Sequence, residues 1–141
     1  EPTLNPLLLS ELIRPFTDPE VVVTTPVRAM NPEWAKSPDR VKAVFSAQHK
    51  ALYFSRAPVP YSRDAIPAQV YGHIGLYAFR MHALEKFVSM PPGRLEKIEN
   101  LEQLRLLENN VPIHVVITEH ESLSVDRPED LETVSRYFEA Q

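Results

Sequence analysis

The chain has 141 residues, of which 43% are hydrophobic and 24% charged, and these are ordinary values for a soluble globular protein. Its 15 basic and 19 acidic side chains give a net charge of −4, which argues against general nucleic-acid binding. The sequence has no cysteine, so disulfides and cysteine nucleophiles are excluded, and no apolar run approaches the ~20 residues that span a bilayer. The length predicts a single domain over residues 1–141.

The first part of the chain predicts a helix, a strand and a short helical turn. Apolar residues recur at helical spacing over residues 5–16, with Asn5 as the N-cap and Pro6 at the first helical position. The β-branched run at residues 21–27 is typical of a buried strand. A single helical turn is expected at residues 31–36.

The middle of the chain predicts a hairpin followed by a long strand. Residues 41–45 and 51–54 are apolar and flank a short polar linker, a spacing typical of a β-hairpin. Residues 69–80 are apolar around two glycines, which predicts one long strand with a close-packing point at a glycine.

Helices dominate the second half of the chain. A helix is expected over residues 81–90, and Pro91, Pro92 and Gly93 end it. Leucine and isoleucine recur at three-residue steps over residues 95–108, which predicts a helical stripe with a bend near Glu99 or Asn100. A strand at residues 111–118 and a closing helix at residues 128–140 follow. Because strands and helices alternate, the fold class is α/β.

Two arginines lie on a proline-containing loop that follows the predicted hairpin. Arg56 and Arg63 are seven residues apart, and Pro58 and Pro60 restrict the backbone between them. Two guanidinium groups on a stiff loop suit a carboxylate or phosphate ligand. The alternative is that both arginines are surface ion-pair partners, for instance of Asp64.

Three residues in the predicted long strand suggest a ligand surface. His73, Gly75 and Tyr77 alternate, so they project from one face of a strand, and Gly75 leaves room between the two polar side chains. The alternative is that His73 and Tyr77 are ordinary packing residues of the sheet.

Acidic and amide side chains complete the set of candidates. Asp126 precedes Pro128 at the start of the last predicted helix, where its carboxylate suits a metal ligand or an N-cap, and its two oxygens allow both roles at once. Glu102 and Gln103 lie in a charged segment that composition alone interprets as a solvated helix face. Because the chain has only three glycines, it has no Gly-rich loop to hold a nucleotide's phosphates.

Several of these segments, in this order, resemble the 3-deoxy-manno-octulosonate cytidylyltransferases, or CMP-Kdo synthetases. The resemblance covers nearly the whole chain. It is carried by Glu1-Pro2, Val41-Lys42, the block from Tyr53 to Asp64, His73-Ile74-Gly75-Leu76-Tyr77, Leu101-Glu102-Gln103-Leu104-Arg105 and Val125-Asp126-Arg127-Pro128-Glu129-Asp130-Leu131.

This resemblance implies a Mg²⁺-dependent transfer of CMP from CTP to the anomeric hydroxyl of 3-deoxy-D-manno-octulosonate (Kdo). Pyrophosphate leaves, and the product serves lipopolysaccharide biosynthesis. It also implies a nucleotide-diphospho-sugar transferase-like three-layer α/β/α fold with a mixed sheet, a cytoplasmic homodimer, and no nucleic-acid or membrane partner. The implied acid-sugar pocket consists of Arg56, Arg63, His73, Tyr77, Glu102 and Gln103. The resemblance assigns catalytic roles to Arg56, Arg63 and Asp126, and the metal to Asp126.

One departure from the family's pattern concerns the beginning of the chain. The family has a basic phosphate-holding loop and a Gly-Asp-Glu-Pro motif whose aspartate is a second metal ligand, and this sequence starts at the Glu-Pro of that motif. We therefore expect the C-terminal portion of such an enzyme, inactive alone. Two alternatives remain open, namely a cytidylyltransferase for another acid sugar such as sialic acid, and a non-catalytic dimerising fragment.

Overall fold

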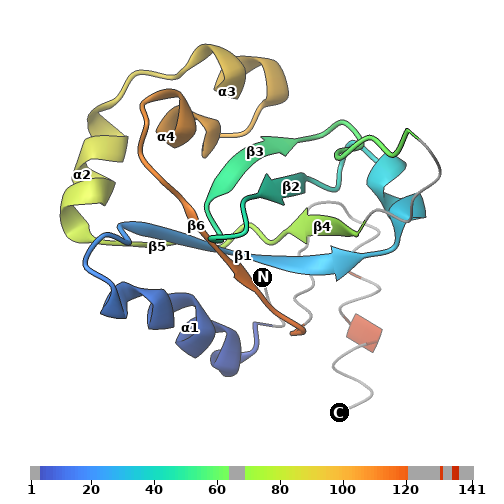
Figure 1. The fold of residues 1–141 in the computed structure, drawn as a ribbon, viewed down its shortest axis with the longest axis horizontal. Coiled ribbons are helices and arrows are strands. Elements are labelled where there is room, and N and C mark those ends of the chain that lie inside the picture. Colours follow the sequence, from blue (N-terminus) through green and yellow to red (C-terminus); the bar gives the residue numbers. More distant parts are fainter. Residues whose placement is uncertain (1–3, 64–68, 121–130, 132–134, 137–141) are drawn as a thin grey trace.

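The computed structural model describes residues 4–63, 69–120, 131 and 135–136 (Figure 1). Within these residues the helical elements, with η for a 3-10 helix, are α1 (Pro6–Ile13), η1 (Arg14–Thr17), η2 (Pro32–Lys36), α2 (Met81–Ser89), α3 (Arg94–Glu99) and α4 (Leu104–Glu108). The strands are β1 (Val23–Met30), β2 (Lys42–Phe45), β3 (Ala51–Ser55), β4 (Val70–His73), β5 (Ala78–Phe79) and β6 (His114–Ile117).

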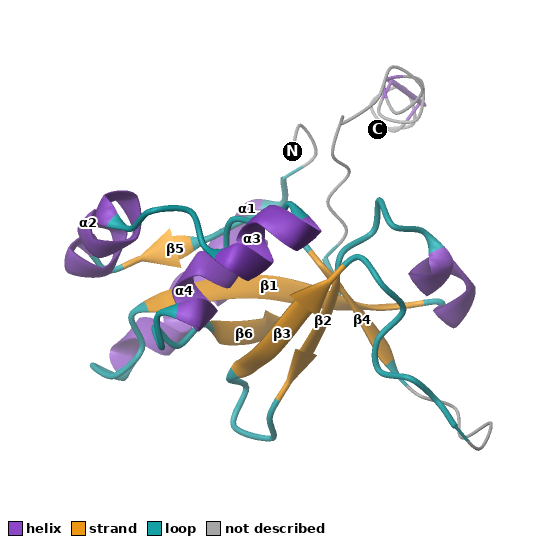
Figure 2. Cartoon of the chain, turned by 90° about the horizontal axis from the view of Figure 1, so that it is seen from above, coloured by secondary structure: helices purple, strands orange, loops and turns teal. Residues whose placement is uncertain are grey.

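One mixed sheet contains all of these strands. Its order is β3-β2-β4-β1-β5, with β6 paired to β1, and among these pairs only β1–β6 is parallel. In Figure 1 α1 lies below the sheet, whereas α2, α3 and α4 lie above it, and Figure 2 shows α3 and α4 crossing over β1. The α/β class and the three-layer α/β/α arrangement expected from the sequence are confirmed.

The main core lies between the sheet and the helices α2 to α4. Phe54, Leu104 and Ile113 are fully buried there, together with Val27 and Val115 from the two parallel strands. Burying a side chain of this size contributes ~1.5 to 3 kcal/mol to stability. On the other face, Leu8 and Leu12 of α1 are buried as well.

The single strand predicted over residues 69–80 is wrong, because the structure divides it into β4 and β5. Pro26 lies in the middle of β1 and its carbonyl accepts a hydrogen bond from Ile74 N, so its missing N–H faces the same neighbour. Without that donor the ladder loses a hydrogen bond beside Ile74, and residues 74–77 leave the sheet before β5 pairs with the start of β1. The interruption places Tyr77 next to the helices above.

The close-packing point expected at a glycine is confirmed at Gly72, which is buried and where an added Cβ would lie 2.5 Å from Met30 Cε, but it does not occur at Gly75. Gly75 is exposed, and a Cβ added to it would meet nothing within 4 Å. Because residues 74–77 form a connection and not a strand, simple alternation does not explain why His73 and Tyr77 are close together.

The helical stripe predicted over residues 95–108 is two helices, and the break falls where the sequence predicts a bend. Asn100 adopts the left-handed conformation, with φ of 54°, and ends α3. At the other end of α3, the Glu108 carboxylate of α4 accepts hydrogen bonds from Leu95 N (3.0 Å) and Glu96 N (3.4 Å). Glu108 thus supplies the capping acceptor that Gly93, at the N-cap, lacks.

Most of the other predicted elements are confirmed. Asn5 caps α1 through a 2.9 Å hydrogen bond from Leu7 N, and Pro6 is the first helical residue. The β2–β3 hairpin, the turn η2, the helix α2 and the strand β6 occur where they are expected. Most of the helix expected at residues 128–140 lies outside the described residues. Among those described, no helix combines the length and the apolar character needed to cross a membrane.

Candidate functional site

A small cavity opens between the β4–β5 connection, α2 and the beginning of α4. Its volume is about 110 Å³. Three of its lining residues are polar candidates from the sequence, namely Tyr77, Glu102 and Gln103. The apolar wall comes from Phe79, Phe87 and Leu106. A mostly apolar cavity with a few convergent polar groups is the usual form of a small-molecule site.

Gln103 is the most informative residue of this cavity. Only 5% of its surface is exposed, and its Nε2 is buried without a hydrogen-bond partner among the described residues. A buried N–H₂ group without a partner costs ~1 to 3 kcal/mol, so native structures rarely retain one without a reason. A ligand oxygen in the cavity would satisfy it. The interpretation of Gln103 as part of a solvated helix face is therefore wrong.

Tyr77 and Glu102 give the cavity a donor and an acceptor. Burial, and secondly the negative charge of Glu102, raise the pKa of Tyr77 well above its usual value, so its hydroxyl stays protonated at neutral pH. Glu102 is exposed on the rim, where its carboxylate can accept hydrogen bonds. Together with the Gln103 amide, these groups suit a ligand with several hydroxyls.

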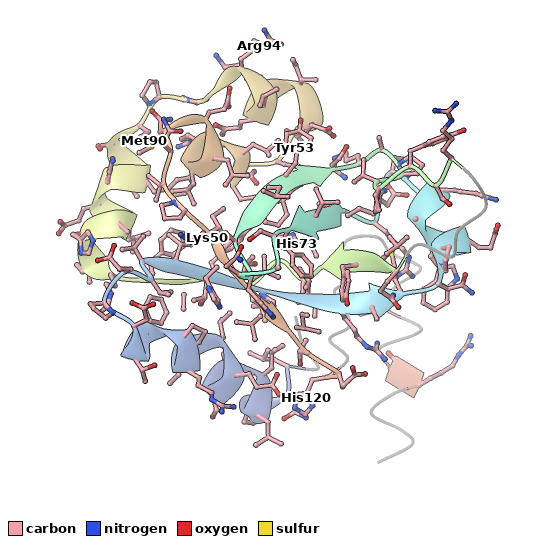
Figure 3. All side chains as sticks on the ribbon, in the orientation of Figure 1. Lys50, Tyr53, His73, Met90, Arg94 and His120 are labelled. Carbon is pink, nitrogen blue, oxygen red and sulfur yellow. The ribbon has the colours of Figure 1, made fainter. Side chains whose placement is uncertain are left out.

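His73 lies beside Tyr77, with a ring-centroid distance of 5.5 Å. Thr25 Oγ1 donates its single hydrogen to Leu76 O (2.7 Å), so its 2.8 Å contact with His73 Nε2 requires the nitrogen to donate. Burial lowers the pKa of His73 to about 4, so the ring is neutral at pH 7. Its Nδ1 is then an acceptor, and His73 contributes no positive charge. Figure 3 shows His73 at the middle of the sheet.

Arg56 follows the end of β3 and is held by backbone carbonyls. Its Nε donates to Glu99 O (2.8 Å), Nη1 to Pro38 O (2.9 Å) and Nη2 to Asn100 O (3.3 Å). A guanidinium has five N–H groups, so two remain for a ligand. Asn100 precedes Glu102 and Gln103 by two and three residues, which links Arg56 to the cavity's polar wall.

The structure does not bring every candidate together. Arg63 is exposed at the end of a described segment, and no contact within the described segments joins it to the cavity. Asp126 lies outside the described residues, as does Asp64, the proposed ion-pair partner of Arg63. Among the residues described, no group of three or more histidine, cysteine, aspartate and glutamate side chains could hold a metal ion.

Sequence reasoning missed three residues that support this site, namely Thr25, Lys42 and Glu99. Thr25 fixes the tautomer of His73, and Lys42 is fully buried although it carries a charge. Lys42 stands between apolar residues of a predicted strand, and that position is itself a signal, because a buried lysine needs dedicated partners. For Glu99, nothing in the local pattern distinguishes it from the other glutamates of its helix.

Comparison with known proteins assigns the family. Residues 1–121 match the family model described as cytidylyltransferase. The chain belongs to the cytidylyltransferase family. A 3-deoxy-manno-octulosonate cytidylyltransferase of Nitratidesulfovibrio vulgaris (strain DP4) is 51% identical over 138 residues, which cover 95% of this chain and 55% of that protein. A protein of the same name from Lawsonia intracellularis is 53% identical over 135 residues, or 95% of this chain and 53% of its own.

The fold of this cytidylyltransferase chain also matches a solved structure. That structure is CMP:2-keto-3-deoxy-manno-octonic acid synthetase complexed with CTP, with a TM-score of 0.94 and 34% sequence identity. The match covers 99% of this chain and 58% of the other. The chain therefore spans about half the length of the cytidylyltransferases that it matches.

Proposed function

We propose that the chain supplies the acid-sugar site of a 3-deoxy-manno-octulosonate cytidylyltransferase. Such an enzyme transfers CMP from CTP to the anomeric hydroxyl of Kdo and releases pyrophosphate, for lipopolysaccharide biosynthesis. The observation that carries the proposal is the unpartnered Gln103 Nε2 in a cavity that also contains Tyr77 and Glu102. The names of the relatives support Kdo as the sugar.

The side chains divide into two groups by chemistry. Gln103, Tyr77 and Glu102 would bind sugar hydroxyls, and neutral His73 would add an acceptor nitrogen. Arg56 and Arg63 would bind the sugar's carboxylate, because guanidinium groups form charge-assisted pairs with carboxylates. In this assignment the protein mainly orients the anomeric hydroxyl for attack on the α-phosphorus of CTP.

The magnesium part of the proposal rests on Asp126. The residues described offer no metal site by themselves, so a Mg²⁺ ion would need Asp126, whose carboxylate oxygens are of the type that Mg²⁺ prefers. Bound there, the ion would offset charge at the reacting phosphate. The sequence contains no Gly-rich phosphate loop, and the chain spans about half the length of its relatives. The proposal therefore includes that this chain binds Kdo but does not by itself turn over CTP.

The proposal also includes a cytoplasmic homodimer. Support comes from β3, which is the edge strand of the described sheet, and from Leu52 on that strand, which is 63% exposed. Ala51 at the start of β3 is bonded to Ile113 O and the end of β3 is buried, so the surface available for pairing is the part of this strand around Leu52.

Isothermal titration calorimetry tests the function directly. Kdo should bind the purified chain, and N-acetylneuraminate, a sialic acid, should bind more weakly. Gln103→Ala should weaken Kdo binding about tenfold, the effect of losing one good hydrogen bond of ~1.4 kcal/mol. Gln48→Ala, at an exposed position of the β2–β3 turn, is the matched control and should bind Kdo like the wild type. Tighter binding of the sialic acid, or no binding of Kdo, would contradict the proposal.

A further inference from the structure

A hydrogen-bonded cluster connects the end of β3 to the end of α3, a few residues before the cavity residues Glu102 and Gln103 in the sequence. Its centre is the Glu99 carboxylate, which accepts from Ser55 Oγ (2.7 Å), Arg56 N (2.9 Å) and, more weakly, Tyr53 OH (3.4 Å). Figure 3 shows Tyr53 on β3 below α3. Burial by itself raises the pKa of Glu99, but the hydrogen bonds outweigh it and the net pKa is lowered, so the carboxylate is ionised at neutral pH.

The same two segments are also joined by hydrogen bonds whose donors lie on Arg56 and whose acceptors lie at the end of α3. The Arg56 guanidinium donates back to the carbonyls of Glu99 and Asn100, the last residues of the α3 turn. Glu99 therefore contacts Arg56 twice, through its carboxylate to the Arg56 backbone and through its carbonyl to the Arg56 side chain. This reciprocal pair fixes both the position and the direction of the guanidinium.

A buried lysine lies against this pair. Lys42 has 0% exposure, and its Nζ donates to Arg56 O (2.5 Å) and Ser37 O (2.9 Å). Burial lowers the pKa of Lys42, the Glu99 charge acts against that shift, and the Arg56 charge adds to it. Glu99 is thus the anion that compensates two nearby cations.

The cluster leads directly into the polar wall of the cavity. Asn100, in the left-handed conformation, is followed by Leu101, whose N–H bonds to Glu96 O, and then by Glu102 and Gln103. The Glu99 carboxylate joins this segment to β3 through Ser55 Oγ and Arg56 N, so losing those bonds would loosen the segment that leads to Gln103 relative to the strand end that carries Arg56.

We propose that Glu99 is a positioning residue that holds Arg56 at the distance from Gln103 that a carboxylated sugar requires. The inference rests on the proposed function, because it assumes that Arg56 binds the carboxylate and Gln103 the hydroxyls. Glu99 itself does not touch the sugar. Its effect should appear in the part of the affinity that depends on the ligand's carboxylate.

The test compares Kdo with its methyl ester, in which the carboxylate charge is absent. The wild-type chain should prefer Kdo about tenfold or more, as expected for a charge-assisted pair. In Glu99→Gln, which keeps the side-chain shape but removes the charge, the preference should fall to about twofold. Glu85→Gln, which removes an exposed carboxylate on α2, should keep the wild-type preference. A merely structural role would lower the affinity for both ligands equally.

A second measurement separates this inference from the proposed function. In ¹⁵N NMR spectra of the free chain, the Arg56 Nε–H, which donates to the Glu99 backbone carbonyl, should be protected from exchange with water in the wild type and in Glu85→Gln. It should exchange faster in Glu99→Gln, because the weaker bonds from Ser55 Oγ and Arg56 N to that side chain hold the Glu99 segment less firmly against β3. If the wild type binds no Kdo, the proposed function fails, and the NMR comparison still decides whether Glu99 holds Arg56. Unchanged protection in Glu99→Gln, or an unchanged preference for Kdo over its ester, would overturn the inference.

Discussion

His73 is held neutral by the groups around it. Thr25 Oγ1 accepts from its Nε2, and burial opposes a second proton on the ring. The sequence predicted a choice between a ligand residue and a packing residue, and the structure shows that His73 packs against Phe54 and Tyr77 while retaining an acceptor nitrogen. Hydroxyl directions of this kind cannot be predicted from the sequence, because Thr25 and His73 are 48 residues apart.

His73 should make the stability of the fold depend on pH. Its pKa is about 4 in the folded chain, compared with about 6.5 when unfolded, so between these values the unfolded state binds more protons. The free energy of unfolding should therefore fall as the pH falls from 6.5 to 4, by about 2 kcal/mol at pH 4.5. Urea denaturation at pH 7 and pH 4.5 measures this loss.

The comparison for that prediction is His73→Gln, which cannot titrate. Its loss of stability between the two pH values should be about 2 kcal/mol smaller than that of the wild type. If both proteins lose the same amount, His73 is not the group responsible and its neutral state in the folded chain is contradicted.

The helices α3 and α4 are held together by side-chain contacts between residues that are far apart in the sequence. The apolar stripe predicted one bent helix, and the position of the bend is confirmed at Asn100. The local pattern does not show that the helix ends at this bend and that a second helix begins after it. The contacts that hold the two helices together come from side chains that are distant in the sequence. Arg105 of α4 donates from Nε to Glu96 Oε2 (2.7 Å) and from Nη2 to Oε1, and its guanidinium lies over the Phe87 ring of α2.

Removing Arg105 should therefore destabilise the chain strongly. Arg105→Met leaves the Glu96 carboxylate largely buried without its partner, and we expect a loss of about 3 kcal/mol in the free energy of unfolding. Lys36→Met breaks the exposed Glu33–Lys36 pair and should cost less than about 0.5 kcal/mol. Equal losses in the two variants, measured by chemical denaturation, would show that the α3–α4 pair is not a buried bridge.

The neighbouring strand β1 explains why the single strand predicted over residues 69–80 is divided into β4 and β5. The apolar content of residues 69–80 favoured one strand, but Pro26, on a different strand, removes the donor that a continuous ladder needs. That is a tertiary effect, and the connection that leaves the sheet at this point carries Tyr77, which lines the cavity. The site residues were predicted from the family resemblance, whereas the strand alternation offered as their physical reason was wrong.

At the scale of the whole molecule, the order of helices and strands was predictable because each element has its own periodicity, cap or breaker. The sheet order was not, since strand pairing depends on contacts far apart in sequence. The functional roles of Asp126 and Arg63 and the proposed dimer also do not follow from the local sequence pattern. Their roles come from the family resemblance, and they stay predictions.

The proposed dimer makes a prediction about association. If β3 pairs with a second copy of the chain, Leu52→Lys should shift the chain toward the monomer, because a charge replaces an apolar side chain at the exposed edge. Val88→Lys, at a 72% exposed position on α2, should leave the association unchanged. Analytical ultracentrifugation measures the association of the two variants. A dimer that persists in Leu52→Lys would show that the interface does not lie at this edge.

The most direct test of the account follows the side-chain amide of Gln103 in ¹⁵N NMR spectra while Kdo is added. If the unpartnered Nε2 is a ligand donor, its signals should shift saturably with the same affinity that calorimetry gives, and the exposed Gln48 amide should stay in place. Saturable binding of Kdo that leaves the Gln103 amide unmoved would contradict the placement of the sugar site in this cavity.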